Sequence, residues 1–272
     1  MKKRRALLFT LLILLFIGIP MGFVMREYRH EQLNRDLIAA IKANDTDKAL
    51  AALKGGSDPN ARDHSDDKPL TWREHATSLI NKIVHPHPKT EPDNHPPALL
   101  WYLRQRDKDD TTLIKALLNA GADPNLACDS GLNPTFFYAA DSPHLQNLRL
   151  LLQYGGNVHL TDDMGWTVLH VAASADNPAA ILLLLDAGAN INAQAKDGTT
   201  PLHQSCSPDH KTETAIPVLL QHHANPNMRD NQGYTPLDWV WSDKLRAVEM
   251  LRKAGAKTGG ELYSQDAAAP KR

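Results

Sequence analysis

Cysteine and aromatic residues are scarce in this 272-residue chain, and its opposite charges almost cancel. The formal net charge of −1 provides no basic surface of the kind that binds nucleic acid, so no nucleic-acid partner is expected. The two cysteines, Cys128 and Cys206, fall in different units of a repeat, and such units stack roughly 10 Å apart. A disulfide requires Cα atoms within about 7 Å, so none is expected, and cysteine content does not identify the compartment.

Sequence motifs for common enzyme mechanisms are also missing. The chain has no phosphate-binding loop, no G-x-S-x-G and no H-E-x-x-H, and no Cys–His–acid arrangement is evident. The sequence therefore predicts a protein without catalytic activity of its own, and it identifies no cofactor site and no established metal site.

The N-terminus carries a long uncharged run. Four of residues 1–5 are basic, and residues 6–25 carry no charge, which at about 1.5 Å per residue spans roughly the 30 Å hydrocarbon core of a bilayer. We expect a transmembrane signal anchor over 6–25, with residues 1–5 cytoplasmic and the remainder extracytoplasmic, periplasmic in a bacterium. The alternative is a cleaved signal peptide and secretion, but Pro20 and Gly22 make a poor cleavage site. Residues 26–36 then form a short polar connector.

A phrase of about nine residues recurs through the rest of the chain. Leu117 begins L-L-N-A-G-A-D-P-N, and Leu184 begins L-L-D-A-G-A-N-I-N. The glycine position recurs at Gly121, Gly155, Gly188, His223 and Gly255. A fixed period near 33 residues indicates a repeat solenoid.

A second phrase opens the later units in the same register. It reads G-W-T-V-L-H from Gly165, G-T-T-P-L-H from Gly198 and G-Y-T-P-L-D from Gly233. Together the two phrases closely resemble the ankyrin repeat over residues 37–256. The resemblance implies an all-α repeat solenoid of six helix-turn-helix units with β-hairpin fingers. The units are expected at 37–63, 96–127, 128–161, 162–194, 195–229 and 230–256, with a finger insertion at 64–95 and a flexible tail at 257–272.

Several motif residues have a structural interpretation. Thr167, Thr200 and Thr235 are placed to cap the first helix of a unit, and Pro201 and Pro236 suit its first position, where a missing N–H costs nothing. His170 and His203 are expected to bond loop backbone. The glycines after the second helix suit a left-handed residue, so His223 predicts local strain. These glycines are Gly121, Gly155, Gly188 and Gly255.

Binding to another protein through the concave face is the leading hypothesis for function. In the ankyrin family, the position between the motif glycine and threonine lies near this face, and here it holds Leu132, Trp166 and Tyr234. Trp239 and, in the insertion, Trp72 complete the predicted contact residues. The repeat domain is expected to be monomeric, tethered to a membrane, with an unidentified protein partner.

Two alternatives remain open at this stage. His85, His87 and His95 lie in the proline-rich insertion, where H-x-H spacing would suit a ligand- or metal-binding carrier. A proline-rich loop without cysteine or paired carboxylate ligands is more often only a loop. The second alternative, an accessory factor to an envelope enzyme, rests on analogy alone.

Overall fold

The computed structural model describes residues 21–64, 67, 69–72, 74–78, 96–104, 111–126, 135–142, 145–207, 213–241 and 244–268. Within these residues every regular element is a helix, and β-pairing is limited to two isolated bridges, Arg62–Pro97 and Thr161–Thr167. The chain forms two compact units, one built on α2 to α6 and one on α7 to α15.

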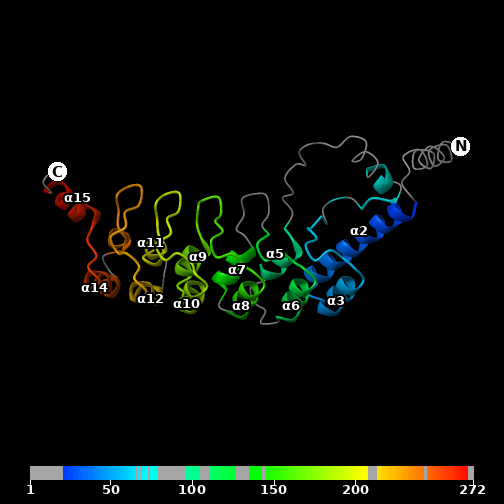
Figure 1. The fold of residues 1–272 in the computed structure, drawn as a ribbon, viewed down its shortest axis with the longest axis horizontal. Helices are drawn as coiled ribbons and strands as arrows, with labels where there is room; N and C mark the ends of the chain where they lie inside the picture. Colours follow the sequence, from blue (N-terminus) through cyan, green and yellow to red (C-terminus); the bar gives the residue numbers. More distant parts are fainter. Residues whose placement is uncertain are drawn as a thin grey trace. The chain divides into compact units, whose positions relative to one another are not determined.

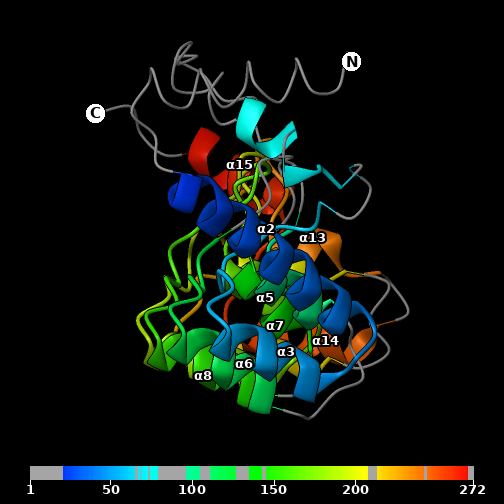
Figure 2. The ribbon, with the colours of Figure 1, turned by 90° about the vertical axis from the view of Figure 1, so that its right-hand side faces the viewer.

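The N-terminal unit includes α2 (Met21–Lys42), α3 (Thr46–Lys54), α5 (Ala98–Leu103) and α6 (Thr112–Asn119). α2 packs against α3, and α3 packs against α6 (Figures 1 and 2). The tight turn after α2 uses Asn44, whose φ is 57°, and Asp45, whose side chain accepts from Lys48 N at 3.0 Å to cap α3. The helices thus pair through a turn that the polar residues themselves stabilise.

The C-terminal unit repeats a helix pair four times. The first helices of the pairs are α7 (Thr135–Asp141), α9 (Val168–Ser174), α11 (Pro201–Ser205) and α13 (Pro236–Trp239). The second helices are α8 (Leu145–Gln153), α10 (Pro178–Asp186), α12 (Ala215–Gln221) and α14 (Leu245–Lys253). Each series forms its own row, in which α9 packs on α7 and α11, and α10 packs on α8 and α12 (Figure 1). Leucines and alanines between the rows form the core.

The fingers between pairs differ from the β-hairpins that the resemblance implies. They hold no strand in the described residues, and the finger before α9 has a single bridge. A tight turn shapes this finger, with Asp162 N donating to Trp166 O at 3.0 Å and Gly165 N to Asp162 O at 3.0 Å. The tips then bond to one another, Lys196 N donating to Met164 O at 2.9 Å. Backbone groups at the fingers are thus bonded both within one finger and between neighbouring fingers.

The predicted single-pass membrane localisation is contradicted. Among the described residues, no helix combines the length and the apolar composition needed to cross a bilayer. Most of the predicted span, residues 6–20, lies outside the described residues. Its remaining residues, 21–25, open α2, which continues through charged residues such as Arg26 and Glu31 and buries Leu37, Ile38 and Ile41. Residues 26–36, interpreted from sequence as a connector, belong to the same helix as the start of the first unit.

The C-terminal tail is also different from the prediction. Residues expected to be flexible form α15 (Gly259–Ala268), whose start carries a capping box. Thr258 N donates to Glu261 Oε2 at 2.7 Å, and Glu261 N donates to Thr258 Oγ1 at 3.2 Å. Arg252 of α14 adds an ion pair to Glu261 at 2.7 Å. This arrangement holds the pKa of Glu261 down at about 2, through the Arg252 hydrogen bond first and the Thr258 N–H second.

Candidate functional site

Three first helices of the C-terminal unit, α9, α11 and α13, begin with the same kind of side-chain cap. The N–H of Thr167 donates to Nδ1 of His170 at 3.0 Å, and the N–H of Thr200 donates to Nδ1 of His203 at 3.1 Å. In the last pair, Asp238 takes the histidine position, and its Oδ2 accepts from the N–H of Thr235 at 2.8 Å. Pro201 and Pro236 occupy the first helical turn of their helices.

Each cap also reaches the following unit. His170 Nε2 lies 3.1 Å from Thr199 O, His203 Nε2 lies 3.2 Å from Tyr234 O, and Thr235 Oγ1 donates to Lys257 O at 2.7 Å. Because Nδ1 accepts from a backbone N–H, Nε2 carries the proton and donates in both histidines. Burial lowers the pKa of His170 and His203, and the carbonyl acceptors oppose this only in part. These histidines are therefore neutral structural links.

The motif glycines adopt the left-handed conformation that closes the second helix of a unit. Among them, Gly121 has a φ of 98° and Gly188 a φ of 90°, with Gly155 and Gly255 similar. His223 occupies the same position with a φ of 68°, where a side chain is disfavoured. His223 thus keeps the backbone conformation of the repeat although its side chain disfavours a positive φ.

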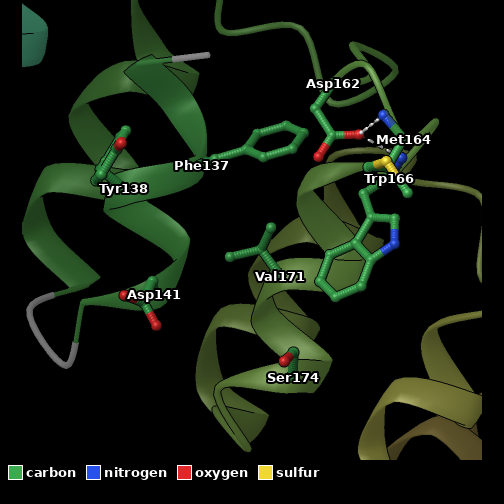
Figure 3. A pocket seen from close by; sticks show the side chains of 8 residues that line it. All are labelled: Phe137, Tyr138, Asp141, Asp162, Met164, Trp166, Val171 and Ser174. Carbon is green, nitrogen blue, oxygen red and sulfur yellow. Dashed lines mark hydrogen bonds between the residues drawn. The ribbon is translucent and has the colours of Figure 1, made fainter. Parts of the chain in front are cut away.

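A cavity of about 390 Å³ opens between α7, α9 and the finger that precedes α9. α7 contributes Phe137, Tyr138 and Asp141, α9 contributes Val171 and Ser174, and the finger contributes Asp162, Met164 and Trp166 (Figure 3). Met164 is 61% exposed and Trp166 is half-buried, so two large apolar side chains border the opening. Trp166 also stacks on His170, with ring centroids 6.1 Å apart.

Asp162 organises the finger beside this cavity. Its Oδ1 accepts from the N–H groups of Met164 at 2.9 Å and Trp166 at 2.8 Å, so one carboxylate oxygen fixes the positions of both apolar side chains. The other oxygen is turned toward Phe137 in Figure 3. Asp141 provides a second carboxylate in the lining. The lining thus combines an aromatic and thioether rim with acidic groups.

The other predicted contact residues do not join this cavity. Tyr234 occupies the position equivalent to Trp166 in the last finger and is 51% exposed. Trp239 is half-buried, packs edge-on against His203 at 5.7 Å and donates from Nε1 to Asp230 Oδ2 at 3.1 Å. Trp72 is half-buried in the insertion of the N-terminal unit, and Leu132 lies outside the described residues.

Sequence reasoning overlooked Met164 and Asp162 as members of the site. Of the residues that line the cavity, only Trp166 was predicted from the sequence as a contact residue. The pattern D-x-M-G-W of residues 162–166 carried a usable signal, because an aspartate four residues before the aromatic position caps the finger turn.

Metal binding by the insertion finds no support in the described residues. His85, His87 and His95 all lie outside them. In the part of the chain that the structure describes, no group of three or more histidine, cysteine or acidic side chains is arranged to hold a metal ion. Cys206 is buried, and burial raises the pKa of its thiol to about 12, which keeps the thiol protonated and unreactive.

Comparison with known proteins agrees with the helix pairs. Two family models match, one described as "Ankyrin repeats (3 copies)" over residues 100–195 and one as "Ankyrin repeats (many copies)" over residues 184–239. The chain is also similar to the "Putative ankyrin repeat protein YahD" of Escherichia coli (strain K12). The two are 29% identical over 237 residues, which cover 83% of this chain and 98% of that protein.

Proposed function

We propose that this chain, which is an ankyrin-repeat protein, works as an interaction scaffold that binds a partner protein at the cavity between α7 and α9. The observation that carries the proposal is the pairing of exposed Met164 with half-buried Trp166 beside that cavity. Tryptophan is enriched among the residues that dominate protein interfaces. A cavity of about 390 Å³ has room for a partner side chain.

The scaffold role is favoured over catalysis by how the polar groups are used. His170 and His203 spend both ring nitrogens on backbone bonds, and the thiol of Cys206 is buried. The two carboxylates in the cavity lining, Asp141 and Asp162, have no histidine base beside them there. Rigid first helices that present a few exposed anchors suit recognition.

Site-specific photocrosslinking tests the proposal. A photoreactive phenylalanine derivative replaces Ser174 in the cavity lining or, as the control, exposed Gln221 at the end of α12. We expect the Ser174 probe to yield a defined adduct in intact cells and the Gln221 probe to yield none. Trp166→Ala should remove the adduct, whereas Trp241→Ala, which changes a 61% exposed tryptophan outside the cavity, should leave it. Equal adducts from both probes, or none from Ser174, would contradict the proposal.

A further inference from the structure

The finger that precedes α13 has a hydrogen-bond donor that the cavity beside Asp162 lacks. Asp230 stands where Asp162 stands, and its Oδ1 accepts from the N–H groups of Gln232 and Tyr234, both at 2.9 Å. Asp162 makes the corresponding bonds to Met164 and Trp166. The two fingers therefore present the same carboxylate in the same way.

The second carboxylate oxygens have different partners. Oδ2 of Asp230 accepts from the indole Nε1 of Trp239, which lies four residues after Thr235. Four residues after Thr167 stands Val171, whose side chain has no polar group to reach Asp162. Among the residues that the structure describes, Oδ2 of Asp162 has no hydrogen-bond partner, and Val171 and Asp162 both line the cavity (Figure 3).

The internal comparison also indicates the shape of the missing group. Trp239 is planar, donates one N–H to the carboxylate and lies edge-on against His203, 5.7 Å away. At the earlier finger, His170 takes the place of His203 and is stacked by Trp166. A group that fits here is flat, carries N–H donors and tolerates aromatic neighbours.

The charges around the cavity favour a cationic group of that shape. Asp141 adds a second carboxylate to the lining, and Asp163 follows Asp162 on the exposed finger. Lys196, whose backbone N–H bonds to Met164 O, is the cationic residue of the adjoining finger tip. Guanidinium is planar, always charged, donates to carboxylates in pairs and packs on aromatic faces.

We infer that the cavity between α7 and α9 binds an arginine side chain of the partner, with its guanidinium on Asp162 and against Trp166. This inference rests on the proposed function, since it specifies the partner chemistry of the same site. The arginine takes the place that Trp239 fills within the last pair. Met164 covers the aliphatic part of the arginine or the neighbouring partner residue.

The test is an NMR titration of the full-length, isotope-labelled chain with N-acetyl-arginine amide. The matched probe is N-acetyl-citrulline amide, which keeps the shape and loses the charge. We expect shifts of the Trp166 indole and of the Met164 and Ser174 amides, with citrulline binding about two- to fivefold more weakly. Asp162→Asn retains an Oδ1 acceptor for the finger and should weaken arginine binding two- to fivefold, by about the strength of an exposed ion pair. Asp186→Asn, at the exposed end of α10, should have no effect.

A second variant tests the arginine site without removing a charge. Val171→Trp supplies the side chain that the last pair already has, so it should fill the cavity and abolish arginine binding while circular dichroism stays unchanged. Equal binding of arginine and citrulline, or shifts away from the cavity, would overturn the inference. If Trp166→Ala abolishes the cellular adduct while arginine and citrulline bind the cavity equally, the scaffold proposal survives and the arginine inference fails.

Discussion

Asn60 and Gly121 are hydrogen-bonded across 61 residues of sequence, from Asn60 Nδ2 to Gly121 O at 3.2 Å. Oδ1 of Asn60 also accepts from Asp123 N at 2.7 Å. In the C-terminal unit the same contact spans far less chain: Asn125 reaches Gly155 across 30 residues and Asn227 reaches Gly255 across 28. The extra length between Asn60 and Gly121 corresponds to the insertion. The hydrogen bonds between the ends of successive repeat units are therefore kept in spite of it.

Replacing residues 64–95 by Asn-Gly should preserve the N-terminal helix pairs. Asp63 N donates to Pro96 O at 3.0 Å and Ala98 N donates to Ala61 O at 2.8 Å, so the two ends of the insertion are already paired and a two-residue turn can join them. The expected cost is up to about 2 kcal/mol, because Tyr28 loses its ring contact with His75 and Arg35 its bonds to His64 O and Asp67 O. Urea unfolding followed by circular dichroism measures it. Loss of cooperative unfolding would show that the insertion belongs to the core.

Acid should destabilise the C-terminal unit through His170 and His203. Burial lowers the pKa of both histidines in the folded chain below the ordinary histidine pKa of 6.5. As the pH falls below 6.5, the unfolded chain therefore binds more protons at these histidines than the folded chain does. This contribution to stability is complete above that pH and is lost as the pH falls toward the folded values. Urea midpoints between about pH 7.5 and pH 5 measure the loss.

The control for acid sensitivity is the double variant His170→Gln and His203→Gln. Glutamine does not titrate and is accepted at the third helical position of a capping box. The variant should be less stable at neutral pH but show a flatter dependence on pH. An unchanged dependence would assign the acid sensitivity to other groups.

Gly259→Ala should detach α15 from the last pair. A Cβ at Gly259 would collide with the carbonyl oxygen of Gly233, and the Gly259 N–H would lose its 2.7 Å bond to Asp238. Gly260→Ala is the matched control, since a Cβ there meets only Thr258 Oγ1 at 4.0 Å and alanine favours a helix by about 1 kcal/mol. Hydrogen exchange at residues 259–265 should therefore accelerate in the first variant and slow in the second. The opposite order would mean that α15 is not docked on Gly233.

His223→Gly should stabilise the chain by about 0.5–1 kcal/mol, because glycine adopts the φ of 68° without the clash of a Cβ. His222→Gly is the adjacent control. His222 has a φ of −94°, which any residue adopts, so glycine there only adds freedom to the unfolded chain and should destabilise. Thermal unfolding of the two variants and the parent chain measures these changes in stability. A destabilised His223→Gly would mean that the histidine side chain makes a compensating contact.

The helix pairs were predictable because each has its own turn and capping residues in the sequence. Thr200-Pro201 and Gly188 act locally, so their pattern reveals the unit that they begin or close. α15 was missed because Thr258 is followed by two glycines, which disfavour a helix, and the signal that prevailed was Glu261 together with the ion pair to Arg252.

The cavity was less accessible to sequence reasoning. Trp166 was named as a contact residue from its motif position, but the space beside it depends on Val171 being smaller than its counterpart Trp239. That comparison needs the three-dimensional equivalence of two fingers. The uncharged N-terminal run was misinterpreted for a different reason. Hydropathy alone gave no indication that residues 21–25 begin a charged helix that packs on α3.

The bonds from each cap to the next unit have a direction. His170 reaches Thr199, His203 reaches Tyr234 and Thr235 reaches Lys257, always toward the C-terminus. During synthesis on a ribosome, which releases the N-terminal part first, each of these helix pairs must wait for its successor before its buried polar groups are satisfied. Lys257 lies after the fourth helix pair, so the bonding of the series is complete only once the chain has been translated beyond that pair.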